Sequence, residues 1–298
     1  MLTDASVLKG VTNLVDLLRH RAAHDGRERG YTYVVDGEST RRHLTYEQLD
    51  KKARAIAATL QSLNLAGERA LLLYPTGLDF IAAFFGCLYA GVIAVPAYPP
   101  RKNRNLKRIQ AIAADATPRI ALTMQEDLDR VELMAGDTPI LDEMRWWATD
   151  SGANDSADGW TAPKIDSQSL AFLQYTSGST GAPKGVMLSH DNLMHNASII
   201  TQVFRPRAAA GSLFWLPLYH DMGLIGGVLQ PLYMGNTNTL FSPTHFLQKP
   251  VRWLKLLSDL GAGISGGPNF AYDLCVERGS GGKKEQPRLC PMALSFYS

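Results

Sequence analysis

The chain has 298 residues, a length that suits one large domain or two medium domains rather than one small core. Hydrophobic residues make up 45% and charged residues 19% of the sequence, a composition typical of soluble globular proteins. The formal net charge is +2, and no basic stripe with interleaved aromatic residues occurs, so we expect no binding to nucleic acid.

The cysteines and the first residues bear on the location of the protein. Cys87, Cys275 and Cys290 are widely spaced and odd in number, so neither a disulfide framework nor a metal site of the zinc type is expected. Residues 1–18 lack a basic segment followed by an apolar core, so we expect no secretion signal. Together these features predict a cytoplasmic protein.

From the N-terminus, the sequence predicts a helix, a strand and a second helix. Residues 12–24 carry apolar side chains at helical spacing, residues 31–36 alternate as a strand does, and residues 44–63 form a long amphipathic pattern. Thr45 followed by Gln48 resembles a capping box that opens the second helix.

A stretch without charged residues follows at 80–98 and is nearly as long as the roughly 20 residues that cross a bilayer. Gly86, Gly91 and Pro96 interrupt it. We therefore predict a buried helix over about 78–90, a glycine turn and a buried strand over 92–96, and no membrane span.

Short apolar strands alternate with helices in this part of the chain. Strands are predicted at 68–75 and 118–123, with a helix at 101–114 between them. This alternation predicts an α/β fold whose parallel sheet is covered on both faces. The basic run at 101–108 could dock an acidic partner, but a solvated helix face is favoured.

The most polar and glycine-rich segment, residues 150–160, is the best internal boundary. We predict one α/β subdomain at 1–160 and a second at 161–298. Beyond the boundary, the patterns predict a strand at 169–176, a helix from about Ser189 or His190, and strands at 211–217, 236–243 and 262–268. Residues 88–96 and 232–243 share an order of helix end, glycine, strand and proline, which suits two similar halves.

The segment YTSGSTGAPKGV, residues 175–186, combines glycines, hydroxyl side chains and one lysine directly after a predicted strand. It does not have the Walker A spacing, because Pro183 stands where that motif needs glycine, and it contains no G-x-G-x-x-G. Glycines let backbone N–H groups approach an anion, hydroxyls donate hydrogen bonds, and Lys184 adds a positive charge. A phosphate-binding loop is therefore favoured over a flexible surface turn.

This segment resembles the phosphate-loop signature of the adenylate-forming superfamily, which includes acyl-CoA synthetases, peptide-synthetase adenylation domains and luciferases. Residues 216–235 and 265–276 resemble the fatty acyl-AMP ligases, which load long-chain acids onto carrier proteins of polyketide synthases. Residues 44–61 and 91–101 fit the same group, and the likeness runs from about residue 10 to residue 277.

The resemblance implies a reaction in two steps that uses ATP and Mg²⁺. A fatty-acid carboxylate attacks the α-phosphate of ATP to give acyl-adenylate and pyrophosphate. The acyl group then passes to the thiol of an acyl carrier protein or polyketide synthase, or to coenzyme A in the sister enzymes. Positioning and stabilisation of phosphate charge do most of the work in the first step.

The resemblance also implies roles for individual residues. His220 would act beside the acyl carboxylate as the catalytic residue, and Asp221 would either cap a helix starting at Met222 or lie near the substrate. The turn at 266–270 would form a wall of the acyl pocket, although a plain tight turn before a helix fits equally well. The residues that would hold the phosphates are Thr176, Ser177, Gly178, Ser179, Thr180, Gly181, Lys184 and Gly185. The residues of the pocket wall are Gly266, Gly267, Pro268, Asn269 and Phe270.

The likeness ends near residue 277, before the family's adenine, ribose and magnesium motifs and its C-terminal lid domain with the catalytic lysine. We therefore expect an incomplete second subdomain, magnesium ligands mostly outside this chain, and negligible adenylation by residues 1–298 alone. Two other interpretations stay open: part of an acyl-CoA ligase, and a non-catalytic module that binds acyl chains or a carrier protein.

Overall fold

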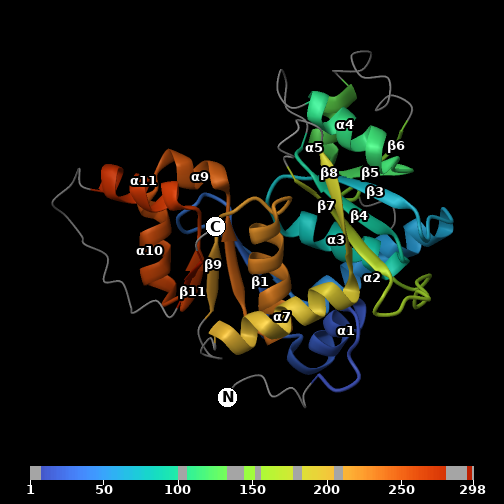
Figure 1. Cartoon of the computed structure of the whole chain (residues 1–298), viewed down its shortest axis with the longest axis horizontal. Helices are drawn as coiled ribbons and strands as arrows, with labels where there is room; N and C mark the ends of the chain where they lie inside the picture. Colours follow the sequence, from blue (N-terminus) through green and yellow to red (C-terminus); the bar gives the residue numbers. More distant parts are fainter. Residues whose placement is uncertain are drawn as a thin grey trace.

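Helices and strands alternate along the chain and build two six-stranded sheets (Figure 1). The structure is a computed structural model, and it describes residues 8–99, 106–132, 144–151, 156–176, 183–204, 211–279 and 294–296. The predicted α/β class is confirmed.

The first sheet is parallel except at one edge, where β2 runs antiparallel to β1. Its strand order is β12-β11-β9-β10-β1-β2. The bounds are β1 (Gly30–Val34), β2 (Arg41–Thr45), β9 (Ser212–Phe214), β10 (Asn238–Phe241), β11 (Ile264–Gly266) and β12 (Leu294–Phe296).

The second sheet has the same design, with β8 antiparallel to β7 at one edge. Its order is β6-β5-β3-β4-β7-β8. The bounds are β3 (Arg69–Leu73), β4 (Ile93–Ala97), β5 (Ile120–Thr123), β6 (Arg145–Ala148), β7 (Leu170–Thr176) and β8 (Lys184–Ser189). The predicted parallel sheet is correct except at the edge pairs β1–β2 and β7–β8, which are antiparallel.

Each sheet contains strands from both sides of residue 160. Strand β1 pairs with β10, which places Tyr31 opposite Asn238, and β4 pairs with β7, which places Ala94 opposite Phe172. The predicted boundary at residue 160 therefore does not separate one sheet from the other. Long-range strand pairing, which local composition does not encode, is the reason.

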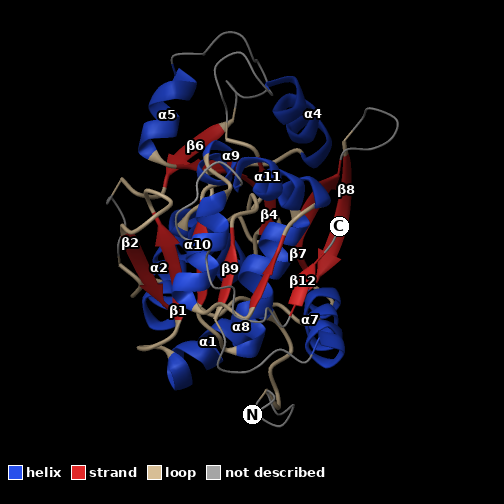
Figure 2. Ribbon diagram, turned by 90° about the vertical axis from the view of Figure 1, so that its left-hand side faces the viewer, coloured by secondary structure: helices blue, strands red, loops and turns tan. Residues whose placement is uncertain are grey.

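The helices cover the sheets in layers. Figure 1 shows α9, α10 and α11 beside β9 and β11, and α4 and α5 at the far end beside β5 and β6. Figure 2 shows α4 and α5 at the opposite end of the molecule from α1, α7 and α8. The bounds are α1 (Leu14–Asp25), α2 (Tyr46–Ser62), α3 (Leu78–Ala90), α4 (Leu106–Ala116), α5 (Gln125–Glu132), α7 (His190–Phe204), α8 (Gln230–Met234), α9 (Pro243–Gln248), α10 (Val251–Leu260), α11 (Asn269–Gly279) and the π-helix η1 (Met222–Leu229).

A large apolar core lies between the sheets, and a smaller one lies under α4. Successive side chains of a strand point to opposite faces, so Leu72 of β3 joins the central core while Leu71 and Leu73 join the smaller one. Ile109 and Ile112 of α4 close the smaller core. Both faces of the second sheet are therefore buried, as predicted.

Several local predictions are confirmed. Thr45 and Gln48 form the capping box of α2, with both reciprocal hydrogen bonds present. The uncharged stretch at 80–98 divides into helix α3, a turn at Gly91 and strand β4. Within the described residues, no helix is both long enough and apolar enough to cross a membrane.

The two similar segments noted in the sequence adopt the same local structure. Helix α3 ends at Gly91 with φ +69°, and α8 ends at Gly235 with φ +67°, each followed by a strand. Both values lie in the left-handed region, which favours glycine as a C-cap. Of the basic run at 101–108, residues 101–105 lie outside the described residues.

Candidate functional site

A cavity of about 430 Å³ lies where the carboxyl ends of strands from both sheets meet. We call it the apolar cavity. It is lined by the segments that follow β3, β4, β9, β10 and β11, including Thr76, Pro99, Leu216, Thr244 and Pro268. In open α/β sheets, ligands bind at the carboxyl ends of the strands. The position of the cavity therefore marks it as a candidate binding site.

Aromatic side chains form one wall of the apolar cavity. The Trp215 indole stacks on Phe246 with ring centroids 3.8 Å apart, and it meets the edge of Phe270 at 6.3 Å. A Cβ on Gly267 would lie 3.0 Å from the indole, so this position favours glycine. Trp215 is thus in contact with neighbours on both sides of its ring. It was not singled out from the sequence.

A second cavity of about 130 Å³, the polar cavity, adjoins the first, because Tyr219 and His220 line both. Its other walls are the end of β7 with Thr176, the end of β4 with Tyr98, and Arg108 from α4. A site with one apolar and one polar compartment suits an amphipathic ligand.

His220 and Asp221 form a close pair at the junction of the two cavities. The Nδ1 atom of His220 lies 2.6 Å from Oδ1 of Asp221 and 3.4 Å from the backbone nitrogen of Met222. These two contacts hold the ring through Nδ1, on the side opposite to Nε2. Both side chains are more than half exposed, so the pair is open to solvent.

Asp221 also accepts a hydrogen bond from the backbone N–H of Met222 at 2.6 Å and caps η1, as predicted. The helix that follows is a π-helix, a form that is frequent at functional sites.

The predicted phosphate loop lies between two antiparallel strands. Thr176 ends β7 and stands opposite Lys184, the first residue of β8. The predicted helix start at about Ser189 or His190 is confirmed by α7, which begins at His190, but strand β8 before it was not predicted. The proposed phosphate residues Ser177, Gly178, Ser179, Thr180 and Gly181 lie outside the described residues.

Gly185 has a packing role that the sequence did not indicate. It stands opposite Tyr175, and a Cβ on Gly185 would lie 2.9 Å from the tyrosine ring. The Tyr175 hydroxyl donates a hydrogen bond of 2.5 Å to Asp115 of α4. Burial, together with this carboxylate, raises the pKa of Tyr175.

The predicted pocket wall at 266–270 divides into two groups. Pro268 and Phe270 line the apolar cavity, whereas Gly266 ends β11 and Asn269 begins α11. The segment is both a turn before a helix and part of a cavity wall. Its role in acyl binding stays a prediction.

The described residues offer no evident metal site. Among them, no group of three His, Cys, Asp or Glu side chains could hold a metal ion. The magnesium ion that the resemblance implies therefore has no ligand set in the described part of the chain, and no step below is assigned to it.

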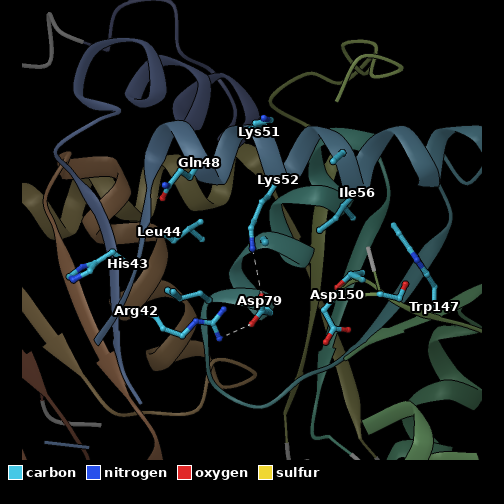
Figure 3. A pocket seen from close by; sticks show the side chains of 15 residues that line it. Arg42, His43, Leu44, Gln48, Lys51, Lys52, Ile56, Asp79, Trp147 and Asp150 are labelled. Atoms are coloured by element: carbon cyan, nitrogen blue, oxygen red, sulfur yellow. Dashed lines mark ion pairs between the residues drawn. The ribbon is translucent and has the colours of Figure 1, made fainter. Parts of the chain in front are cut away.

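A third cavity of about 620 Å³ lies between the edge strands β2 and β6. Figure 3 shows Arg42 from β2 and Lys52 from α2 converging on Asp79, at 3.8 Å and 3.9 Å. Its lining shares no residue with the other two cavities. Its central charges pair with one another, so we place the candidate site at the adjoining cavities.

The fold and the cavities together define an α/β protein with an apolar and a polar cavity that adjoin at the carboxyl ends of its strands. The chain belongs to the family described as AMP-binding enzymes, which it matches over residues 19–293.

Two of the similar proteins are named as fatty-acid ligases. The chain is 43% identical over 274 residues to a medium-chain-fatty-acid–[acyl-carrier-protein] ligase of Moorena producens, and the alignment covers 90% of this chain and 46% of the relative. It is 36% identical over 252 residues to a long-chain-fatty-acid–AMP ligase of Mycolicibacterium smegmatis, covering 83% of this chain and 40% of that protein. The chain spans about half the length of the curated relatives it matches.

A crystal structure gives the same result for the fold. The fatty acyl-adenylate ligase from L. pneumophila, solved in complex with acyl adenylate and pyrophosphate, superimposes with a TM-score of 0.90 at 41% sequence identity. The match covers 99% of this chain and 50% of that one. The fold is thus that of the N-terminal domain of adenylate-forming enzymes.

Proposed function

We propose that this chain provides the phosphate loop and the acyl pocket of a ligase that activates a fatty acid with ATP and transfers it to a carrier-protein thiol. The observation that carries the proposal is the junction at His220, where an apolar cavity adjoins a polar one lined by Thr176 at the end of β7. An acyl chain would lie in the apolar cavity, and its carboxylate would lie beside His220.

In the first step, a carboxylate oxygen forms a bond to the α-phosphorus of ATP, and the bond from that phosphorus to the oxygen bridging to the β-phosphate breaks. Pyrophosphate leaves, held by the proposed phosphate residues between β7 and β8 and by Lys184. Asp221 holds the His220 ring through its Nδ1 side. When Nε2 carries a proton, the ring donates to the carboxylate or the α-phosphate and offsets their negative charge.

In the second step, a thiolate attacks the acyl carbonyl carbon, and the bond to AMP breaks. The carrier protein is proposed as the acceptor because the Moorena producens relative is named as an acyl-carrier-protein ligase. A polyketide synthase as the source of the carrier, and a cytoplasmic location, stay predictions from the sequence.

The proposal is tested by joining residues 1–276 of this chain to the remaining part of the Moorena producens relative. We expect this chimera to form acyl-adenylate from ATP and a fatty acid, detected by mass spectrometry and by pyrophosphate release. Residues 1–298 alone are expected to form none. A folded chimera without activity on any fatty acid would contradict the proposal.

The role of His220 is tested in the same chimera. His220→Ala removes a donor that stabilises developing charge, so we expect adenylate formation to slow about 10²-fold. His195→Ala is the control, because His195 is an exposed residue of α7. Equal rates in the two variants would show that His220 has no part in the reaction.

The acceptor of the second step is decided by comparing the rates of acyl transfer to carrier protein and to coenzyme A in the chimera.

A further inference from the structure

Arg108 carries a positive charge that the described structure does not neutralise. It projects from α4 and lines the polar cavity, with its Nε atom buried and without a hydrogen-bond partner. Among the described residues, its recorded contact is with an aromatic ring: the guanidinium carbon lies 5.3 Å from the centroid of Tyr98. Asp221 lines the same cavity, but among the described residues no ion pair joins it to Arg108. Arginine in a cavity normally pairs with an anion.

A second buried polar atom lies in the same cavity wall. Gln174 is 6% exposed and donates through Nε2 to the carbonyl oxygen of Tyr219 at 3.0 Å, whereas its Oε1 is buried without a partner. Leaving such an atom unsatisfied destabilises the fold, because the hydrogen bonds it made to water are not replaced. Two unsatisfied polar atoms at one small cavity indicate that the cavity is built for a polar ligand.

The position of Arg108 is fixed by its neighbours. Asp115, two turns further along α4, holds the Tyr175 hydroxyl, and Ile112 between them packs into the smaller core. On the other side, Tyr98 packs against Tyr219, with ring centroids 4.2 Å apart and ring planes tilted by 46°. The helix face that carries Arg108 is thus attached to the end of β7, next to Thr176.

We infer that Arg108 is a further phosphate-binding residue, which places its guanidinium against the phosphoryl oxygens that occupy the polar cavity beside Thr176 and His220. The planar guanidinium suits phosphate because it donates two parallel hydrogen bonds. The inference rests on the proposed function. It adds a second positive charge, from helix α4, to that of Lys184 on strand β8.

Binding of inorganic pyrophosphate to residues 1–298 tests the inference. We expect Arg108→Met to raise the dissociation constant for pyrophosphate at least tenfold in calorimetric titration. Arg108→Lys should raise it by less, since lysine keeps the positive charge but lacks the two parallel N–H donors of the guanidinium group. Lys107→Met is the matched control: Lys107 precedes Arg108 on α4, has the same charge and is exposed. It should change the constant less than twofold.

Far-ultraviolet circular dichroism and a thermal melt establish whether each variant is folded. If Arg108→Met does not fold, the more conservative Arg108→Lys still tests the inference. Unchanged pyrophosphate binding in a folded Arg108 variant, or equal losses for Arg108 and Lys107, overturns the inference. So does a wild-type chain that binds no pyrophosphate at millimolar concentration.

The chimera separates this inference from the proposed function. A chimera with Arg108→Met that keeps its KM for ATP and its rate of adenylate formation overturns the inference and leaves the function standing. A wild-type chimera that forms no adenylate contradicts the function, and the pyrophosphate titration of residues 1–298 still decides the role of Arg108.

Discussion

His190 begins α7 and is 1% exposed, in contact with the start of α1. Its Nδ1 accepts a hydrogen bond from the backbone N–H of Leu14 at 3.3 Å, which requires an unprotonated Nδ1. Burial lowers the pKa of His190 to about 4, and Asp166 opposes this shift only in part. The neutral ring is therefore part of the folded structure.

This gives a pH dependence with a defined sign. The unfolded chain binds a proton at His190 below about pH 6.5, whereas the folded chain does so only below about pH 4. The stabilisation of the folded state by neutral His190 is fully present above pH 6.5 and is lost as the pH falls toward 4. Between pH 7 and pH 5 we expect His190 to account for a loss of about 2 kcal/mol in the free energy of unfolding.

Urea unfolding at pH 7, 6 and 5 measures this loss. His190→Gln removes the titrating group, so its stability should fall less over this range than that of the wild type. His195→Gln, at an exposed position on the same helix, should keep the wild-type slope. Parallel pH profiles for wild type and His190→Gln would show that another group is responsible.

Gly267 provides a second prediction at this scale. A Cβ there would lie 3.0 Å from Trp215, whose indole is held from the other side by Phe246. Gly267→Ala must displace the indole, at a cost of about 1 kcal/mol or more. We expect weaker binding of a fluorescent fatty acid to the apolar cavity. Gly159→Ala, whose Cβ meets only an ordinary contact at 3.8 Å, is the control and should bind as the wild type does.

At the scale of the element, η1 depends on one close approach. A Cβ on Gly223 would lie 2.0 Å from the carbonyl oxygen of Pro217, a backbone atom that cannot rotate away. The same turn holds His220, whose N–H donates to that oxygen at 3.1 Å and whose carbonyl accepts from Leu224 at 2.9 Å. The glycine therefore fixes the position of the candidate catalytic residue.

Two substitutions in this π-helix should differ sharply. Gly223→Ala is expected to destabilise the fold by at least about 3 kcal/mol, at the upper end for overpacking. Gly226→Ala places a Cβ 3.5 Å from Phe214, an ordinary contact, and should cost less than about 1 kcal/mol. Chemical unfolding of both proteins measures the difference in their free energies of unfolding. Similar unfolding midpoints would contradict the close approach of Gly223 to the Pro217 carbonyl.

Elements with strong local signals could be predicted from the sequence. The capping box at Thr45, the glycine caps and the apolar runs of β3 and β4 each act within a few residues. Strands β2, β6 and β8 were missed because their pattern is weak. Three of the six residues of β8 are exposed, and its pairing partner decides its conformation.

The site shows the same limit. The motif residues Thr176, Lys184, His220 and Asp221 were named from the sequence. Arg108, Gln174 and Trp215 were not, since only tertiary packing brings them to the cavities. A polar Gln174 inside the apolar strand β7 was the one signal that could have indicated a functional position.

At the scale of the whole molecule, strand exchange across residue 160 determines what can fold alone. Residues 1–160 lack β10, one of the two strands that pair with β1, and residues 161–298 lack β4, one of the two that pair with β7. We expect neither part, expressed separately, to unfold cooperatively in thermal melts followed by circular dichroism. The intact chain is the control, and a cooperative transition in either part would contradict the expectation.

The pairing of β1 with β10 also bears on the order of events during synthesis. The β1–β2 hairpin ends at Thr45, but its neighbour β10 ends at Phe241. At about 5–20 residues per second, the ribosome needs on the order of 10 to 40 seconds to make the intervening chain. Throughout that interval one edge of the hairpin has no partner, whereas β3, β4 and β5 have already been made and can pair. The nascent chain therefore completes the inner strands of its second sheet first, and its earliest strands are among the last to be enclosed.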